Sequence, residues 1–225
     1  MILQALYKLA QDEGLMQDPD YEYKSVAWLV RVADSGNLLG IQGTHYIPEP
    51  SSPRRKPRPI PKQFLVPRRT RVETSGDVPA LLCGKPEYVF GIDPDNKRRP
   101  RKLANRFRLF REQVKACLDA THDPGVRAVH DFLAAIAAAR QTIRLPPECT
   151  RGDWFAFIYD PDVALLVHRR EAVRHFWTPV SADASEAPGS PRRCLVSGLT
   201  VTQFESFPHL EGFPTKKGAT RVALI

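Results

Sequence analysis

Residues 51–71 contain a dense run of Lys and Arg side chains, and we call this segment the basic arm. It carries eight cations and no acid, and five of its residues are proline. Proline fixes φ and removes a backbone donor, so a stiff, extended segment is expected rather than a helix. Dense Lys and Arg favour a phosphate polyanion, because neutralising phosphates releases counterions. The cations are Arg54, Arg55, Lys56, Arg58, Lys62, Arg68, Arg69 and Arg71.

A second group of cations lies over residues 97–115, where only Glu112 opposes nine basic side chains. This segment is predicted to be a helix, because its apolar residues Leu103, Phe107, Phe110 and Val114 recur at intervals of three and four. The helix is therefore expected to have one core face and one basic face. Together the two groups hold 17 of the 33 Lys and Arg residues. The second group comprises Lys97, Arg98, Arg99, Arg101, Lys102, Arg106, Arg108, Arg111 and Lys115.

Three other interpretations of this charge remain open. The basic arm is also consistent with a solvated, disordered loop, and the basic face of the helix with docking onto an acidic protein. Acidic membrane lipids are a weaker alternative, because packing against the following Ala-rich helix explains the apolar face better. The FLV segment inside the arm (residues 64–66) is predicted to anchor it in a core.

No constellation for catalysis is evident in the sequence. A Walker loop, a G-x-G-x-x-G turn and an H-E-x-x-H helix are all lacking. The His130-Asp131 pair stands without further ligands on a predicted helix, and Asp93 and Asp95 are better explained as turn formers. His168 is expected to be structural. The chain is thus predicted to be non-catalytic and to need neither metal nor cofactor.

Composition sets the general class of the protein. The chain has 225 residues, a net charge of +8 and 42% apolar residues, which fits a globular protein with an acidic partner such as nucleic acid. Neither a signal peptide nor a bilayer-spanning segment is expected, because the N-terminus has no basic n-region and the sequence has no apolar run of sufficient length. Cys83, Cys117, Cys149 and Cys194 stand singly, so reduced thiols and a cytoplasmic location are expected.

Hydrophobic periodicity predicts an α+β fold, with small mixed or antiparallel sheets, a helical pair and long basic loops. DSGN between two apolar runs predicts a β-hairpin. The polar loop at residues 181–193 is a possible joint within one domain over residues 1–225. Helices are expected at residues 2–13, 97–115, 125–140 and 169–177, and strands at 26–32, 38–41, 88–92, 154–159, 163–168, 194–196 and 201–204, with a basic turn at 211–218 and a final strand in RVALI.

Several ordered segments resemble the large-subunit family of the type I-C CRISPR Cascade surveillance complex. They are MILQALYKLA, WLVRVADSGNLLGIQ, KQFLVPRR, TSGDVPALLCGKPEYVFGI, NRFRLFREQVKACLDATHDPGVRAVHDFL, FAFIYDPDVALLVHRREAVRHFW, CLVSG and GFPTKKGATRVALI. Members of that family are longer and continue past the segment that RVALI resembles. The resemblance therefore implies the N-terminal part of such a subunit, without the family's helical C-terminal region.

The resemblance also implies a role. The large subunit lies near the handle of the guide RNA, reads the protospacer-adjacent motif of duplex DNA, and helps recruit the effector nuclease-helicase. The implied partners are guide RNA, double-stranded target DNA, the handle-binding and backbone subunits of Cascade, and that nuclease-helicase, but no membrane. Guide pairing reads the sequence, while the protein reads the motif and the backbone.

Within that role, the basic arm and the basic helix face are expected to hold phosphates, which gives affinity and register but not sequence. Asn105 and Gln63 can pair with adenine, and the small basic turn at Thr215, Lys216 and Lys217 is a candidate reader of base edges. Phe213 is a candidate wedge between base steps. Two alternatives from other classes are an RNA-binding assembly protein, and a metal-dependent nuclease that uses Asp93, Asp95 or His130.

Overall fold

The computed structural model describes residues 20–47, 59–69 and 78–183, together with short strands between residues 192 and 222; side chains are described as far as residue 178. The chain divides into two compact units. One unit spans Gln17–Ala184, and the other combines Met1–Met16 with Ser185–Ile225. The basic helix and the described part of the basic arm belong to the larger unit.

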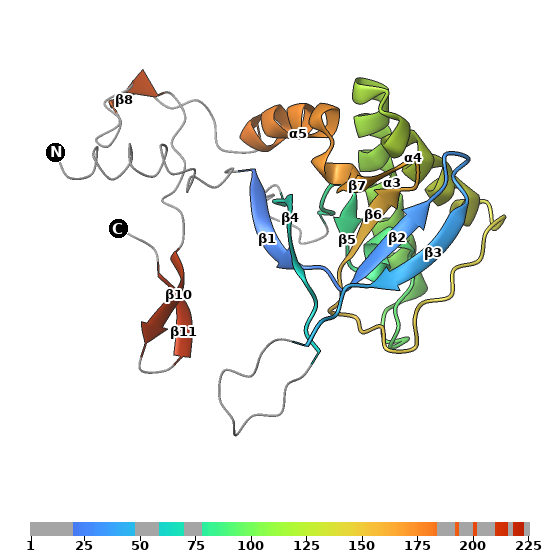
Figure 1. Cartoon of the computed structure of the whole chain (residues 1–225), viewed down its shortest axis with the longest axis horizontal. Coiled ribbons are helices and arrows are strands. Elements are labelled where there is room, and N and C mark those ends of the chain that lie inside the picture. The colour runs from blue at the N-terminus through green and yellow to red at the C-terminus, as the bar shows by residue number, and fades with distance from the viewer. Residues whose placement is uncertain are drawn as a thin grey trace. The chain divides into compact units, whose positions relative to one another are not determined.

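A five-stranded mixed sheet forms the centre of the larger unit (Figure 1). Its order is β3 (Leu38–Gly43), β2 (Trp28–Val32), β6 (Phe155–Tyr159) and β5 (Cys83–Gly84), and β7 (Asp162–Leu166) also pairs with β6. β2 and β6 run parallel, while β3, β5 and β7 are antiparallel to their neighbours. The predicted hairpin from the DSGN turn is confirmed as β2–β3.

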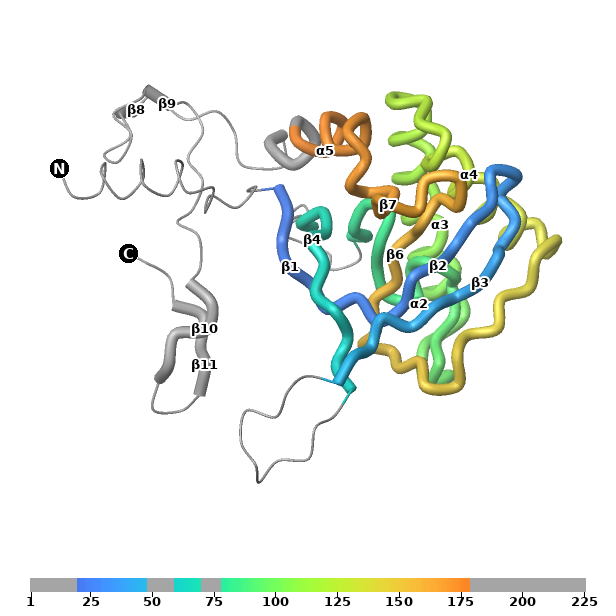
Figure 2. The backbone as a smooth tube through the Cα atoms, in the orientation of Figure 1, coloured from blue at the N-terminus to red at the C-terminus, as the bar shows by residue number. Residues whose placement is uncertain are grey.

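Two helices, α3 (Pro100–Thr121) and α4 (Pro124–Ala137), cover one face of this sheet (Figures 1 and 2). Side chains alternate along a strand, so Val30 and Phe157 face the helices from neighbouring strands. Phe110 of α3 and Phe132 of α4 pack against Phe157, with ring centroids 6.5 and 6.0 Å apart. The predicted helical pair and its apolar face are therefore confirmed.

The stem of the basic arm lies in a small second sheet. β1 (Tyr21–Ser25) pairs with β4 (Gln63–Pro67) in antiparallel register. Val66 of β4 is fully buried, in a cluster with Val26, Cys83 and Trp154. The FLV segment thus anchors the arm in a core, as predicted, while residues 51–58 and 70–71 of the arm lie outside the described part.

The expected strand at residues 88–92 is wrong. This segment begins as a short helix, α2 (Pro86–Val89), with proline in its first turn. Tyr88, Val89 and Phe90 are all nearly or fully buried, which explains why the run looks like a strand. Glu87, in the same turn, is also buried, and its arginine partners lie on α3 and just before it.

The remaining elements of the larger unit follow β7. The 3₁₀ turn η1 (Val167–Arg169) leads into α5 (Glu171–Asp183), which is longer than the predicted helix at residues 169–177. Trp177 of α5 is fully buried, and its indole N–H donates to the carbonyl of Asp20 at 3.2 Å. The helix is thereby fixed against the start of β1.

The second unit holds two short antiparallel pairs. β8 (Arg192–Arg193) pairs with β9 (Thr200–Val201), and β10 (Leu210–Thr215) pairs with β11 (Gly218–Val222). Helices and small mixed sheets therefore occur together, which confirms the α+β class. The predicted helix at residues 2–13 lies outside the described residues.

Candidate nucleic-acid interface

The basic helix α3 begins and ends for clear local reasons. Pro100 occupies its first turn, where the missing N–H costs nothing. It ends at His122, which adopts the left-handed conformation with φ of 50°. Asp123 then caps α4 by accepting the Val126 N–H at 3.1 Å. The short connection holds α3 and α4 side by side and so fixes which α3 side chains face solvent.

Three cations stand exposed at the start of α3. Arg99, Arg101 and Lys102 all lie on the surface, and the first turn contains no acid. Within the described residues none of the three forms an ion pair closer than 4 Å. The amino end of a helix carries partial positive charge, so cations there oppose the helix dipole. Their placement therefore does not serve the stability of the helix, and it leaves a concentrated positive surface.

Further along the same helix, Arg108 is also exposed, but its guanidinium has hydrogen-bond partners on α3. Its guanidinium donates to the Glu112 carboxylate at 2.6 and 2.8 Å, and to Asn105 Oδ1 at 3.0 Å. Asn105, the predicted adenine reader, is exposed on this surface beside Arg108. The structure thus brings Asn105, Arg108 and the three cations of the first turn onto the outer surface of one helix.

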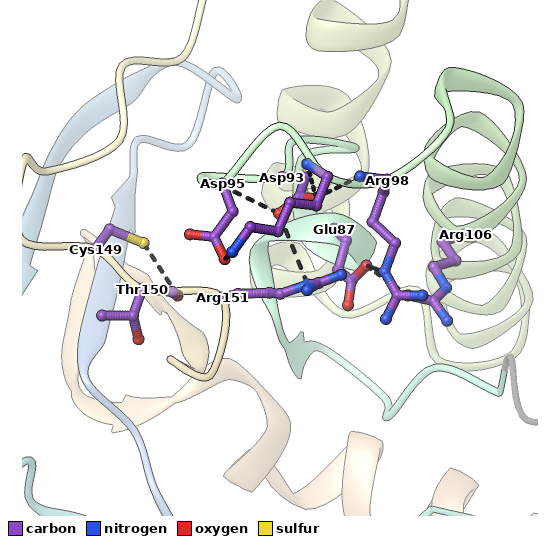
Figure 3. A network of polar contacts seen from close by, with 9 residues as sticks. Glu87, Asp93, Asp95, Arg98, Arg106, Cys149, Thr150 and Arg151 are labelled. Carbon is purple, nitrogen blue, oxygen red and sulfur yellow. Dashed lines mark hydrogen bonds and ion pairs between the residues drawn. The ribbon is translucent and has the colours of Figure 1, made fainter.

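Two of the predicted phosphate contacts instead have a partner inside the protein. Arg106 is buried and forms an ion pair with Glu87, while its guanidinium lies 5.0 Å from the Tyr88 ring centroid. Arg98 Nε lies 3.2 Å from the same Glu87 carboxylate. Figure 3 shows both arginines converging on Glu87. Arg106 therefore joins α2 to α3, and it is not part of the exposed basic surface.

The stem of the basic arm presents a second group. Lys62, Gln63 and Arg68 are exposed on or beside β4. Arg69 is half-buried, because its guanidinium lies 5.4 Å from the Tyr88 ring centroid and 5.2 Å from that of Trp154. Cation–π contacts of this kind orient an arginine without using its N–H donors.

The remaining predicted residues lie outside the described part of the chain. These are Arg54, Arg55, Lys56, Arg58 and Arg71 of the arm, together with Lys216 and Lys217. Thr215 ends β10 and pairs with Gly218, the first residue of β11. The basic turn predicted at residues 211–218 is therefore wrong over most of its length, because residues 211–215 lie in β10 and Gly218 begins β11.

Asp93, one of the carboxylates considered for a nuclease, lies in the loop before α3. Asp93 is buried, and its carboxylate accepts the backbone N–H groups of Asp95, Lys97 and Arg98 at 3.2, 2.9 and 2.8 Å. Burial acts to raise the pKa of Asp93, but these hydrogen bonds and the nearby Arg151 hold it below its ordinary value. Asp93 thus organises the loop before α3, which confirms its interpretation as a turn former (Figure 3).

A buried histidine and three cysteines of the larger unit are also potentially reactive groups. Burial lowers the pKa of His168 to about 4, and its Nε2 lies 3.1 Å from the Leu65 carbonyl oxygen, so a structural role is confirmed. Cys83, Cys117 and Cys149 are free thiols. Burial raises the pKa of Cys117 and of Cys149 to about 12, which keeps both protonated. Among the described residues no group of three His, Cys, Asp or Glu side chains is arranged to hold a metal.

Comparison with known families supplies the context for this basic surface. The model of a CRISPR-associated protein family, Cas_Csd1, matches residues 3–222. The chain belongs to the Cas_Csd1 family. Because the match covers nearly the whole sequence, it includes both units and all of α3. A search of curated proteins returned no match.

Membership of the Cas_Csd1 family confirms the coarser part of the sequence-based prediction, a CRISPR-associated protein of the type I-C large-subunit family. Exposed cations of this Cas_Csd1 protein gather on α3 and on the stem of the basic arm, and both belong to the larger unit. None of the helices in the described part of the chain combines the length and hydropathy that crossing a bilayer requires.

Proposed function

We propose that this chain is a non-catalytic, nucleic-acid-binding subunit of a CRISPR RNA-guided complex. In this role it recognises the protospacer-adjacent motif of duplex DNA, contacts the handle region of the guide RNA beside the other Cascade subunits, and helps recruit the effector nuclease-helicase. The observation that carries the proposal is the exposed group Arg99, Arg101 and Lys102, within a member of the Cas_Csd1 family.

The exposed cations suit backbone contacts. Arg99, Arg101 and Lys102 follow one another at the amino end of α3, where the helix dipole adds to their positive field. Such contacts supply salt-dependent affinity and fix the register of the protein on the duplex. Reading of the motif itself requires side chains at base edges, and Asn105, Gln63 and the Lys216-Lys217 turn are our candidates for it.

The decisive experiment measures target-duplex binding by the guide-RNA-loaded complex, with and without this chain, at two salt concentrations. The duplexes differ only in the few base pairs that flank the target. We expect the chain to raise affinity for one flank over the others. Equal gains for every flank would contradict motif reading, and would favour the alternative of an RNA-binding assembly protein that acts as a backbone clamp.

Two sets of substitutions separate the two kinds of contact in that assay. Arg99→Gln/Arg101→Gln/Lys102→Gln should lower the slope of log affinity against log salt by about three units without changing flank preference. Lys216→Ala/Lys217→Ala should instead alter flank preference, because each side chain removed from a base edge weakens discrimination by about 1–3 kcal/mol. An unchanged salt slope in the triple variant would show that the start of α3 makes no phosphate contacts.

A further inference from the structure

A small cavity lies between α3 and α4, away from the first turn of α3. It has a volume of about 150 Å³. Four of its lining residues are basic in type, one is acidic, and Leu133 is buried in the core beneath. The lining residues are Arg108, Arg111, Glu112, Lys115, His130 and Leu133.

The cations of this cavity are only loosely held by the protein. Arg108 pairs with Glu112, and Lys115 with Asp119 at 2.6 Å, but the side chains of both pairs are more than half exposed. Exposed pairs four residues apart on a helix add little stability, so a stronger anion can displace the carboxylates. The Arg108 and Lys115 side chains are therefore available to a ligand.

Arg111 is the best-oriented donor of the cavity. Its guanidinium lies 5.7 Å from the Phe107 ring centroid, a contact that directs the side chain but leaves its N–H groups unused. Within the described residues Arg111 has no acidic partner closer than 4 Å. The planar guanidinium presents a fork of donors that matches the oxygens of a phosphate group.

The cavity also continues a row of charge from the start of α3. Arg101, Arg108 and Lys115 are spaced by seven residues, which is close to two helical turns, so they leave the helix on the same side. Successive members of the row lie about 10 Å apart along the helix axis, and the whole row spans about 21 Å. That length corresponds to about six base pairs of a duplex strand. A polymer of regularly spaced charges matches such a row better than a single protein carboxylate does.

We propose that the cavity between α3 and α4 binds a phosphate group of the nucleic-acid backbone, held by Arg111 and Lys115 with Arg108 and His130 at its rim. The proposal rests on the proposed function and extends it, because it gives Arg111 and Lys115 of the predicted basic face one shared ligand and adds His130, which the sequence did not assign to nucleic-acid binding. In the bound state Glu112 and Asp119 yield their cations to the phosphate.

The test compares two variants of the full chain that remove the same charge. Arg111→Gln/Lys115→Gln removes two cavity donors, and Arg31→Gln/Arg144→Gln removes two exposed cations that do not line the cavity. Binding to a labelled 30-base-pair DNA duplex and to an RNA hairpin is measured over a series of salt concentrations. We expect the cavity variant to show a salt slope smaller by about one to two units than that of the control. Its affinity at 0.1 M salt should be lower by about 5–10-fold for each phosphate-binding side chain removed.

Each outcome separates the two proposals. If the unmutated chain binds neither probe, the proposed function fails and the cavity proposal fails with it. If the unmutated chain binds but both variants have the same slope, the cavity proposal alone is overturned. A cavity variant that binds nucleic acid normally but no longer joins the complex would also overturn it, since the ligand would then be an acidic protein surface. Thermal unfolding of both variants checks folding, and Lys115→Gln alone replaces the double variant if that one unfolds.

Discussion

At the scale of single residues, arginines that are neighbours in the sequence have two different roles. Arg106 is buried against Glu87 and Tyr88, while Arg108, two positions later, is more than half exposed. Successive residues on a helix point about 100° apart, so the two side chains face different surroundings. Arg106 has a structural role because Glu87 of α2 lies beside it and pairs with it.

Glu87→Gln should destabilise the protein strongly. The substitution leaves the buried Arg106 guanidinium without a charge partner and also frees Arg98. Removing one member of a buried ion pair exposes the other to an uncompensated desolvation cost, here on the order of 3 kcal/mol. Urea denaturation followed by circular dichroism gives the free energy of unfolding that tests this.

Glu112→Gln is the matched control for Glu87→Gln. It removes a carboxylate that also pairs with an arginine, but both side chains of that pair are more than half exposed. Its cost should stay below about 0.5 kcal/mol. Equal effects of the two substitutions would mean that Glu87 and Arg106 are not a buried pair in solution.

The loop before α3 should show a characteristic pH dependence. Because the pKa of Asp93 is lowered in the folded protein, its ionised carboxylate stabilises the fold at neutral pH. That contribution is lost as pH falls below the ordinary value of 3.8 and through the lowered pKa. The difference in the free energy of unfolding between wild type and Asp93→Asn should therefore be largest at pH 7 and shrink towards pH 3.

Asp95→Asn provides the comparison for Asp93→Asn. Asp95 is exposed and pairs with Lys97 only at 3.5 Å, so its replacement should have little effect at either pH. A difference for Asp93→Asn that stays constant from pH 7 to pH 3 would argue against the hydrogen-bonded carboxylate described above.

At the scale of elements, periodicity predicted the long helices well and the short ones poorly. α3 and α4 each have enough turns for an apolar stripe to repeat, so their type and approximate bounds followed from the sequence. α2 has four residues, and a buried apolar run of that length has no period that separates helix from strand. Its proline start was the available signal, and it was outweighed by Tyr88, Val89 and Phe90.

The turn between β2 and β3 should be intolerant of any side chain at Gly36. This glycine has φ of +77°, and a Cβ there would lie 2.8 Å from the Cβ of Asp131 on α4. Gly36→Ala combines backbone strain with a clash between hairpin and helix, and it should cost about 1–3 kcal/mol in the free energy of unfolding. Thermal or urea unfolding measures this destabilisation.

Gly40→Ala tests whether that effect is specific to the turn. Gly40 lies on β3, where an added Cβ meets nothing within 4 Å. Its replacement should change the free energy of unfolding by less than about 0.5 kcal/mol. A comparable destabilisation at both positions would indicate that any alanine in this hairpin is unfavourable, whatever its distance from α4.

At the scale of the whole molecule, the sequence predicted where positive charge accumulates. It did not predict which of these cations are buried in ion pairs and which are exposed. Counting Lys and Arg identified both basic regions, because cations are rarely buried without a partner. It could not separate Arg106 from Arg101, since the difference depends on Glu87, which is distant in the sequence. Nor could it bring His130 to Arg111 and Lys115, because His130 lies on α4 and meets these α3 side chains only where the two helices pack side by side.

The parallel pairing of β2 with β6 has a consequence for how this protein is made. Trp28 of β2 donates a hydrogen bond to Asp153, 125 residues later, just before β6 begins. The β2–β3 hairpin can form soon after it leaves the ribosome, but its central partner does not yet exist. At typical synthesis rates that partner arrives on the order of ten seconds later. During this interval the edge of β2 that later pairs with β6 presents unpaired backbone N–H and C=O groups to other chains, so nascent copies of this protein should depend on chaperones more than the local hairpin would suggest.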